Sequence, residues 1–212
     1  MSRSQEDLFE SRSPAYSHVF MALNGVLMAI ICISDPLRPE AVEVMKALCR
    51  VGFQNLVMMT GDSKRTAENV AATLELDRFY AEVLPEEKAQ FVKAAKAEGH
   101  RVVMVGDGIN DSPALSEADA GIAIAEGADI AREIADITIS ARDLHQLIVL
   151  KELSNLLMKR VNFNYDFVVS FNAALIALGV AGILPPATTA LLHNGSTIAL
   201  SLHSMTNLKK FV

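Results

Sequence analysis

Two aspartates four residues apart, Asp107 and Asp111, are the side chains in this sequence best spaced to do chemistry. They flank a turn after the apolar run Val102–Val105, and Ser112–Pro113 is typical of the first residues of a helix. A strand that leads through Asp-Gly into a helix places its carboxylates at the carboxyl edge of a sheet, where open α/β folds bind ligands. Because Mg²⁺ prefers carboxylate and phosphate oxygens, the spacing predicts a Mg²⁺-phosphate site with Asp107 as ligand and Asp111 as a second ligand or supporting partner. Ordinary turn chemistry is the alternative that these residues alone leave open.

A second short motif, Thr60-Gly61-Asp62, also follows an apolar run and precedes a helical pattern. This arrangement lets the Thr60 hydroxyl and the Gly61 and Asp62 amides face an anion at the end of a strand. Lys88 is a candidate for neutralising a phosphate as a point charge, although a lysine on a helix is more often simply solvated.

Alternating strands and helices are needed to position these residues. Asn24–Gly25 between two apolar runs predicts a hairpin of strands 19–23 and 26–33. Beyond it, the periodicity predicts strands at 56–59, 81–83, 102–105 and 120–124 and helices at 39–50, 64–74, 86–98, 113–118, 130–134 and 144–159. Strand and helix in alternation imply a parallel, doubly wound sheet of the Rossmann type.

The run Gly106-Asp107-Gly108-Ile109-Asn110-Asp111-Ser112-Pro113-Ala114-Leu115 closely resembles the hinge motif of P-type ATPases, the pumps that phosphorylate one of their own aspartates. Further motifs match this family in the same order: Asp35-Pro36-Leu37-Arg38-Pro39-Glu40, Thr60-Gly61-Asp62, Leu84-Pro85-Glu86-Glu87-Lys88, Ala120-Gly121-Ile122-Ala123-Ile124, Ala128-Asp129-Ile130-Ala131 and Ala135-Asp136. The resemblance covers about residues 20 to 160. It looks most like the heavy-metal-transporting class, because a single apolar hairpin follows the catalytic region.

The resemblance implies a phosphorylation domain of the haloacid dehalogenase superfamily, here partial and followed by a two-helix transmembrane hairpin, with Mg²⁺ and ATP as cofactors. It implies that Thr60 and Gly61 hold the phosphoryl oxygens, that Lys88 neutralises them, and that Asp107 binds Mg²⁺ with Asn110 and Asp111 completing the site. Asp62 belongs to the same catalytic motif. Arg38 resembles a position near the nucleotide; without the resemblance it is a surface arginine.

The phosphorylated aspartate of these pumps is not found in the sequence, because Asp-Lys-Thr-Gly-Thr does not occur in it. We therefore expect the C-terminal part of an ATP-driven heavy-metal cation pump, with the N-terminal part of the same pump as partner and no activity alone. The expected organisation is a polar tail or remnant of a nucleotide-binding domain (1–17), the C-terminal part of the phosphorylation domain (18–145), and a stalk helix with the hairpin (146–212). The alternatives are a membrane-anchored phosphatase of the haloacid dehalogenase superfamily and a non-catalytic, truncated interaction protein.

Two apolar runs near the C-terminus predict membrane helices at about 167–184 and 186–203, joined by Pro185–Pro186. The hydrophobic content of 51% and each run's length fit helices that cross a hydrocarbon core of about 30 Å, with membrane lipid as partner. Cationic residues flank the runs (Lys151, Lys159, Arg160, Lys209 and Lys210). The positive-inside rule therefore predicts an integral plasma or inner membrane protein whose catalytic part and hairpin ends are cytoplasmic. A buried hairpin in a soluble protein is the alternative.

Polar residues interrupt the second run, and intramembrane polar groups suggest an ion pathway. His193, Asn194 and Thr197 are the candidate ligands for a transported divalent transition metal, with Asn172 and Asp166 as possible helpers. An imidazole with oxygen ligands suits Zn²⁺, Cd²⁺, Co²⁺ or Mn²⁺. The equally weighted alternative is that these polar and small residues serve helix packing.

Cysteine spacing and net charge exclude other functions. Cys32 and Cys49 lie in apolar patterns without Cys-x-x-Cys spacing, so we expect buried, reduced thiols. The net charge of −6, with no basic run, gives no electrostatic footprint for nucleic acid.

Overall fold

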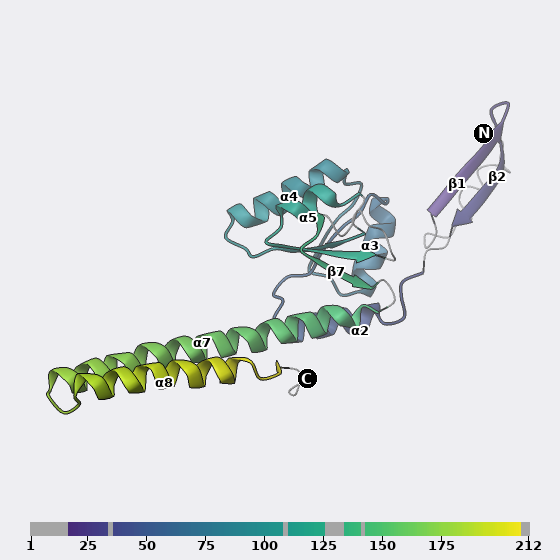
Figure 1. Ribbon diagram of the computed structural model, residues 1–212. Helices are drawn as coiled ribbons and strands as arrows, with labels where there is room; N and C mark the ends of the chain where they lie inside the picture. Colours follow the sequence, from purple (N-terminus) through teal and green to yellow (C-terminus); the bar gives the residue numbers. More distant parts are fainter. Residues whose placement is uncertain (1–16, 34–35, 108–109, 126–133, 141–142, 209–212) are drawn as a thin grey trace. The chain divides into compact units, whose positions relative to one another are not determined.

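The computed structural model describes residues 17–33, 36–107, 110–125, 134–140 and 143–208. It divides the chain into two compact units, residues 1–147 and 148–212 (Figure 1). The expected tail at 1–17, most of the expected helix at 130–134, and the two C-terminal lysines lie outside the described residues.

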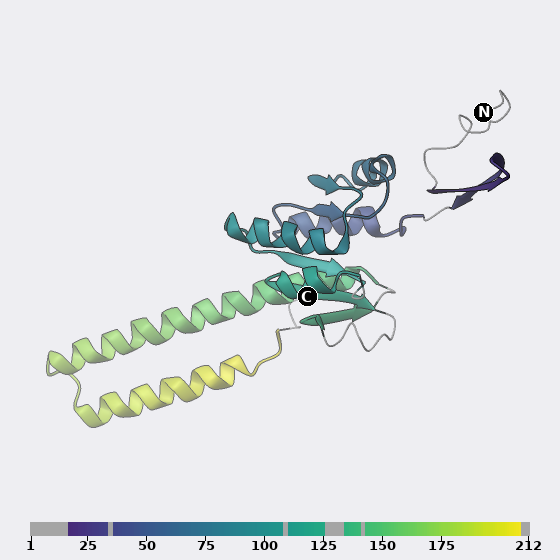
Figure 2. The same ribbon diagram turned by 90° about the horizontal axis from the view of Figure 1, so that it is seen from above.

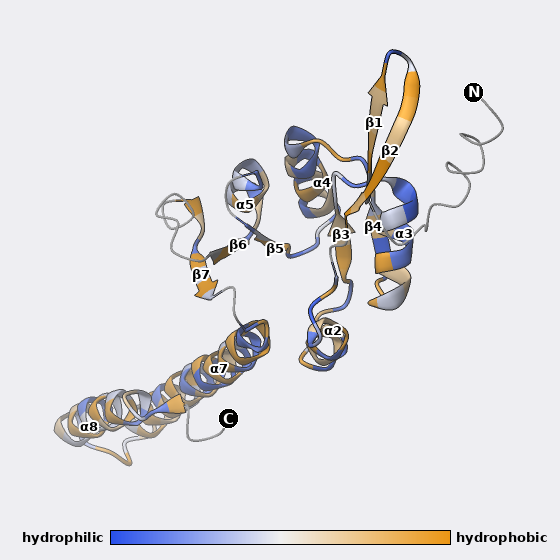
Figure 3. Ribbon diagram, turned by 90° about the vertical axis from the view of Figure 1, so that its right-hand side faces the viewer, coloured by the Kyte–Doolittle hydropathy of each residue, from blue (hydrophilic) through white to orange (hydrophobic). Residues whose placement is uncertain are grey.

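The predicted hairpin is present: β1 (Ser17–Leu23) pairs antiparallel with β2 (Val26–Ile33). Asn24 and Gly25 have φ values of 50° and 78°, the left-handed pair that a two-residue hairpin turn needs. These two strands form a sheet of their own. Most of both strands has the orange colour of hydrophobic residues (Figure 3). Cys32 in β2 is exposed, which corrects the expectation of a buried thiol.

The α/β part begins with α2 (Ala41–Arg50), which starts directly after Pro39 and Glu40 and buries Ala41, Val44 and Leu48. Cys49 lies in the last turn of this helix and is exposed, so its expected burial is also wrong. β3 (Val57–Met59) follows and pairs in parallel with β4 (Arg78–Tyr80), with α3 (Lys64–Thr73) between them.

The strand predicted at 81–83 is displaced, because the structure forms β4 three residues earlier. Leu56 donates its amide to the Asp77 carboxylate at 2.6 Å, which fixes where the chain enters the pairing. Glu82 has a φ of 57°, a left-handed conformation that a strand excludes.

The second half of the α/β part forms a three-stranded parallel sheet, with α4 (Pro85–Ala97) preceding it. Its strands are β5 (Val103–Gly106), β6 (Ala120–Ala125) and β7 (Ile137–Ser140), in that order, and α5 (Ser112–Glu117) connects β5 to β6. α4 and α5 pack together on one side of this sheet (Figures 1 and 2). The sequence interpretation did not include β7. Parallel α/β architecture is confirmed.

The buried core under the two aspartates is small. Val92, Met104, Ala114 and Leu115 form it, with Met59 at the end of β3 packed against them. The last residue of β3 therefore lies beside β5, and the carboxyl ends of both strands belong to one region of the molecule.

The C-terminal unit is a helical hairpin. The expected stalk and first membrane helix form one continuous helix, α7 (His145–Val180), and α8 (Pro186–Ser204) runs back along it (Figures 1 and 2). Within the described residues, α7 alone is long and apolar enough to cross a membrane. The sequence predicts a second membrane span at about 186–203, which is the region of α8. Polar residues interrupt this helix, and it does not reach the hydropathy of a membrane span.

Candidate phosphate and magnesium site

An ion pair joins two of the predicted site residues. Lys88 Nζ, in the first turns of α4, donates to Asp111 Oδ1 at 2.7 Å. The two side chains are only 14% and 12% exposed, so the contact is largely withdrawn from water. A charge-assisted contact of this length is strong where solvent is excluded, and it orients both groups.

The backbone around this pair holds it in place. Pro85 occupies the first turn of α4, and the Glu87 carboxylate accepts the Leu84 amide at 2.8 Å. This reciprocal contact is half of a capping box, which fixes the start of the helix that carries Lys88. The signal Leu-Pro-Glu-Glu was visible in the sequence, yet Glu87 was not predicted as a supporting residue.

Gly106 makes the position of Asp111 possible. A Cβ atom added at Gly106 would lie 2.7 Å from the Cβ of Asp111 and closer still to its Oδ2. Real Cβ atoms essentially never approach so closely, so the last residue of β5 must lack a side chain for the carboxylate to lie over it.

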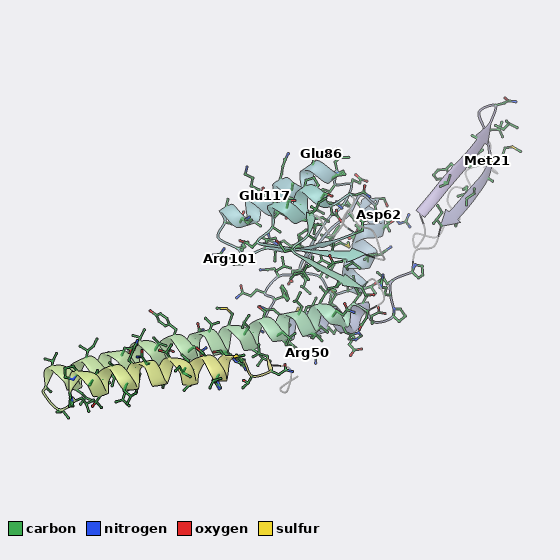
Figure 4. The ribbon with its side chains drawn as sticks, in the orientation of Figure 1. Met21, Arg50, Asp62, Glu86, Arg101 and Glu117 are labelled. Atoms are coloured by element: carbon green, nitrogen blue, oxygen red, sulfur yellow. The ribbon has the colours of Figure 1, made fainter. Side chains whose placement is uncertain are left out.

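The Thr60 motif forms a self-bonded loop at the end of β3. The Thr60 hydroxyl donates to Asp62 Oδ2 at 2.8 Å and accepts the Asp62 amide at 3.1 Å. The Thr60 amide donates to Tyr80 O, and Thr60 O accepts the Val83 amide, both at 3.0 Å. Asp62, labelled in Figure 4, lies just before α3, whose N-cap is Ser63. The loop is therefore held by its own contacts, in which the Thr60 hydroxyl and the Asp62 amide and carboxylate bond to each other.

The remaining predicted residues lie in more open positions. Asp107 and Asn110 are exposed, and the residues between them, 108–109, lie outside the described part of the chain. Arg38 is 4.0 Å from Glu40 at the start of α2. Carboxylate oxygens of Asp107 and Asp111 at the carboxyl end of one strand fit Mg²⁺, a hard cation that takes oxygen ligands.

Two aspartates outside the predicted site residues hold the β5–β6–β7 sheet together: Asp119, which the sequence interpretation missed, and Asp136 of the Ala135-Asp136 motif. Asp119 Oδ2 accepts the Val102 amide at 2.9 Å, and Asp136 Oδ2 accepts the Gly121 amide at 2.8 Å. The Val102 amide, together with Arg101, lowers the pKa of Asp119 more than burial raises it. At the start of α7, the backbone amide and ring of His145 lower the pKa of Asp143 in the same way.

In the helical hairpin, the structure places His193 against a helper residue. Its Nδ1 lies 2.7 Å from Asn172 Oδ1 on α7. Ser196 and Thr197 both donate their hydroxyls to the His193 carbonyl, at 2.8 and 3.0 Å. Across the described residues, no group of three or more His, Cys, Asp or Glu side chains forms a metal cage. A metal site here needs oxygen ligands or a further segment.

Known proteins are similar to this chain over both its α/β part and its helical hairpin. A family model for haloacid dehalogenase-like hydrolases matches residues 3–119. The zinc-exporting P-type ATPase of Mycobacterium marinum is 39% identical over 203 residues, which are 95% of this chain and 28% of that protein. The manganese-exporting P-type ATPase of Mycobacterium bovis is 38% identical over 203 residues, with the same two shares.

A solved structure is similar over nearly the whole chain. The crystal structure of a zinc-transporting PIB-type ATPase in its E2.Pi state matches with a TM-score of 0.76 and 28% sequence identity, covering 94% of this chain and 32% of that one. The chain therefore spans less than a third of the length of these relatives. It matches their phosphorylation-domain region.

Proposed function

The chain belongs to the haloacid dehalogenase-like hydrolase family, and from this premise we propose that it works as the C-terminal part of an ATP-driven heavy-metal cation pump. The observation that carries the proposal is the Lys88–Asp111 pair, 2.7 Å long and shielded from water at the carboxyl end of β5. Two further observations support the same function: relatives are named as zinc and manganese exporters, and an apolar helical hairpin follows the α/β part along the chain.

The proposed chemistry of the α/β part is the positioning of a phosphoryl group. Asp107 and Asp111 hold Mg²⁺, which when bound neutralises negative charge on the phosphoryl oxygens. Lys88 supplies a second positive charge, and Thr60 with the Gly61 amide orients the oxygens at the end of β3. Phosphoryl transfer depends mostly on such positioning and charge neutralisation.

We infer that the nucleophilic aspartate comes from a segment outside these residues. In the described part of the chain, β3 and β5 are each the edge strand of a hydrogen-bonded sheet. Met59 of β3 and Met104 of β5 pack in the same core. Val57, Val103 and Val105 on these strands are 47%, 38% and 37% exposed, whereas parallel strands are usually buried on both faces. Open edges with exposed valines are what an additional parallel strand would cover.

In the hairpin, His193 is the proposed ligand of the transported ion. Since Asn172 Oδ1 only accepts, His193 donates from Nδ1, and the neutral ring then offers its Nε2 lone pair to a metal. Asn194 and Thr197 are the proposed oxygen ligands beside it. Both hairpin ends and the catalytic part are proposed to be cytoplasmic, on the positive-inside rule.

The gene sequence and an activity assay test this proposal. Reading the coding sequence upstream of Met1 should give the Asp-Lys-Thr-Gly-Thr motif in the same frame. Membrane vesicles that carry the resulting longer protein should hydrolyse ATP when Zn²⁺ or Mn²⁺ is added, and Asp107→Asn should abolish this through lost Mg²⁺ coordination.

Hydrolysis of soluble phosphate esters without metal stimulation would instead favour the membrane-anchored phosphatase. An upstream region without that motif, in a protein that expresses but does not hydrolyse ATP, would contradict a pump.

A further inference from the structure

The open end of the helical hairpin, opposite its Pro185–Pro186 turn, is joined by a cluster of polar contacts from α7. Arg160 Nη1 donates to Ser204 O at 3.1 Å and to Thr206 O at 2.7 Å, and its Nη2 donates to Thr206 Oγ1 at 3.2 Å. One turn along α7, Asn164 Nδ2 donates to Ser204 Oγ at 2.8 Å. We call these contacts the Arg160 clamp.

The clamp acts where α8 most needs partners. The last carbonyl groups of a helix have no backbone N–H donor within the helix, and they carry the negative end of its dipole. A guanidinium presents several donors in a fixed plane, so one side chain satisfies the Ser204 carbonyl in the last turn of α8 and the Thr206 carbonyl and hydroxyl just beyond it. The clamp therefore fixes the end of α8 in both position and rotation.

Apolar packing does not define the register of α8 by itself. α8 itself has no buried residue, although Leu175 on α7 is only 5% exposed, so apolar packing between the two helices is limited. Between apolar helices in lipid there is no hydrophobic driving force for association, and hydrogen bonds between side chains become the specific contacts. The cross-helix contacts seen here include the Arg160 clamp, the ring contact of Phe163 with His203 at 6.1 Å, and the bond between His193 and Asn172.

The clamp and the His193–Asn172 bond are the same number of residues apart on α7 and on α8. Twelve residues separate Arg160 from Asn172, and twelve separate His193 from Met205, the residue between the two clamped carbonyls. Both intervals span about 18 Å of helix. A slip of one residue would shift α8 by about 1.5 Å and rotate it by about 100°, which would break the contacts at both ends together.

We propose that Arg160 is a positioning residue: it sets the register of α8 against α7 and so holds the His193 ring against Asn172. It does not touch the ion. The effect of Arg160 on metal transport rests on the proposed function of His193 as ligand. Its effect on the orientation of the His193 ring does not.

The ring is tested first, without metal, on the whole 212-residue chain in lipid nanodiscs. Nitrogen NMR of isotope-labelled histidine reports which ring nitrogen carries the proton, and the His193 signal is identified by its loss in His193→Ala. We expect a single Nδ1-protonated form, which becomes a mixture of both tautomers in Arg160→Leu. Lys159→Leu is the matched control, because this neighbouring exposed lysine contributes no contact to the clamp.

A wild-type His193 signal in Arg160→Leu would overturn the proposal, and so would the same change in Lys159→Leu. If Arg160→Leu does not fold, Arg160→Lys provides the test: an ammonium cannot reproduce the planar fork, so an intermediate tautomer mixture is expected and an unchanged signal counts against the clamp.

Metal binding is tested second, in the longer pump. Because partners that orient a metal-binding histidine change affinity by about 10–100-fold, Arg160→Leu should raise the metal concentration for half-maximal ATPase activity by about tenfold. Phosphorylation from inorganic phosphate should be unchanged. If Arg160→Leu changes the His193 tautomer but not the metal dependence, the positioning role of Arg160 stands and His193 is refuted as ligand. Failure of the positioning role and failure of the ligand role are therefore distinguishable.

Discussion

At the scale of single residues, the site depends on charges that neutralise each other. Asp111 is 9% exposed as a whole residue, and Lys88 is the positively charged partner of its carboxylate. Breaking such a pair by removing one member leaves an uncompensated charge, which costs more than the pair itself contributes. The same pair bears on the proposed function, because Lys88 would share its charge between Asp111 and a bound phosphoryl group.

Lys88→Met should therefore destabilise the chain by about 1–3 kcal/mol, the cost of a buried polar group without its partner. Lys93→Met is the control, since Lys93 is an exposed lysine on the same helix and should change stability little. Urea unfolding of both variants in detergent micelles, followed by circular dichroism, measures the difference. Equal unfolding midpoints would show that the pair contributes nothing to stability.

Two glycines near the site should respond differently to a methyl group. Gly106→Ala places a Cβ against the Asp111 side chain and should lower stability by about 1–3 kcal/mol through overpacking. Gly61→Ala meets only Val83 O, at an ordinary 3.8 Å, and should be tolerated in stability. Thermal unfolding of the two variants side by side tests this, and a larger loss for Gly61→Ala would contradict the geometry.

The sequence predicted the residue types of the site but not all of their contacts. Asp107, Asp111, Thr60 and Lys88 were identified from motifs, and the structure brings Lys88 and Asp111 together. The supporting roles of Gly106 and Glu87 were not predicted, because a close approach between two backbone segments is a three-dimensional property that sequence spacing does not encode.

At the scale of elements, Asp119 connects the beginning of β6 with the start of β5. Its carboxylate accepts the Val102 amide at 2.9 Å and lies 3.1 Å from Arg101 Nη1. Because the Val102 amide lowers its pKa in the folded chain, the ionised form is favoured by folding. The stabilisation is complete above the unfolded pKa of about 4 and is lost as the pH falls through the lowered folded value.

Asp119→Asn should therefore be less stable than the wild type at neutral pH, with the difference shrinking below about pH 4. Urea midpoints measured from pH 7 down to pH 3 test this dependence. Glu68→Gln on α3 is the control, an exposed carboxylate that should show no such convergence. A difference that stays constant with pH would assign the effect to side-chain shape and not to charge.

Elements with strong local signals were predicted well, and weakly signalled ones were not. Asn24–Gly25 predicted the hairpin, and the helix predicted at 86–98 is present one residue earlier, as α4. β4 was misplaced because a three-residue strand has almost no periodicity, and its position depends on a bond between Asp77 and Leu56, 21 residues apart. β7 was missed for the same reason: four residues, Ile137–Ser140, form a strand only by pairing with β6.

At the scale of the whole molecule, the chain divides chemistry between its two units. The α/β unit carries the groups proposed to bind phosphate and Mg²⁺, and the helical unit carries His193, the proposed ion ligand, on a helix that is apolar apart from a few uncharged polar residues. Hydropathy predicted the hairpin but placed a break between stalk and membrane helix, because the charges at Lys159 and Arg160 interrupt the apolar pattern. The structure shows that α7 continues through them, with Arg160 turned to α8.

The chain alone should neither hydrolyse ATP nor form an acyl phosphate, although its α/β part is proposed to position a phosphoryl group. No Asp-Lys-Thr or Asp-x-Asp nucleophile motif occurs in its sequence, and positioning without a nucleophile offers no covalent path. Purified chain is incubated with labelled ATP and Mg²⁺, and a full-length zinc-exporting relative serves as the positive control. Acid-stable label on this chain that hydroxylamine releases would refute the prediction and point to an unrecognised nucleophile. If such label appears, its loss in Asp107→Asn would show that the Mg²⁺ site described above supports the reaction.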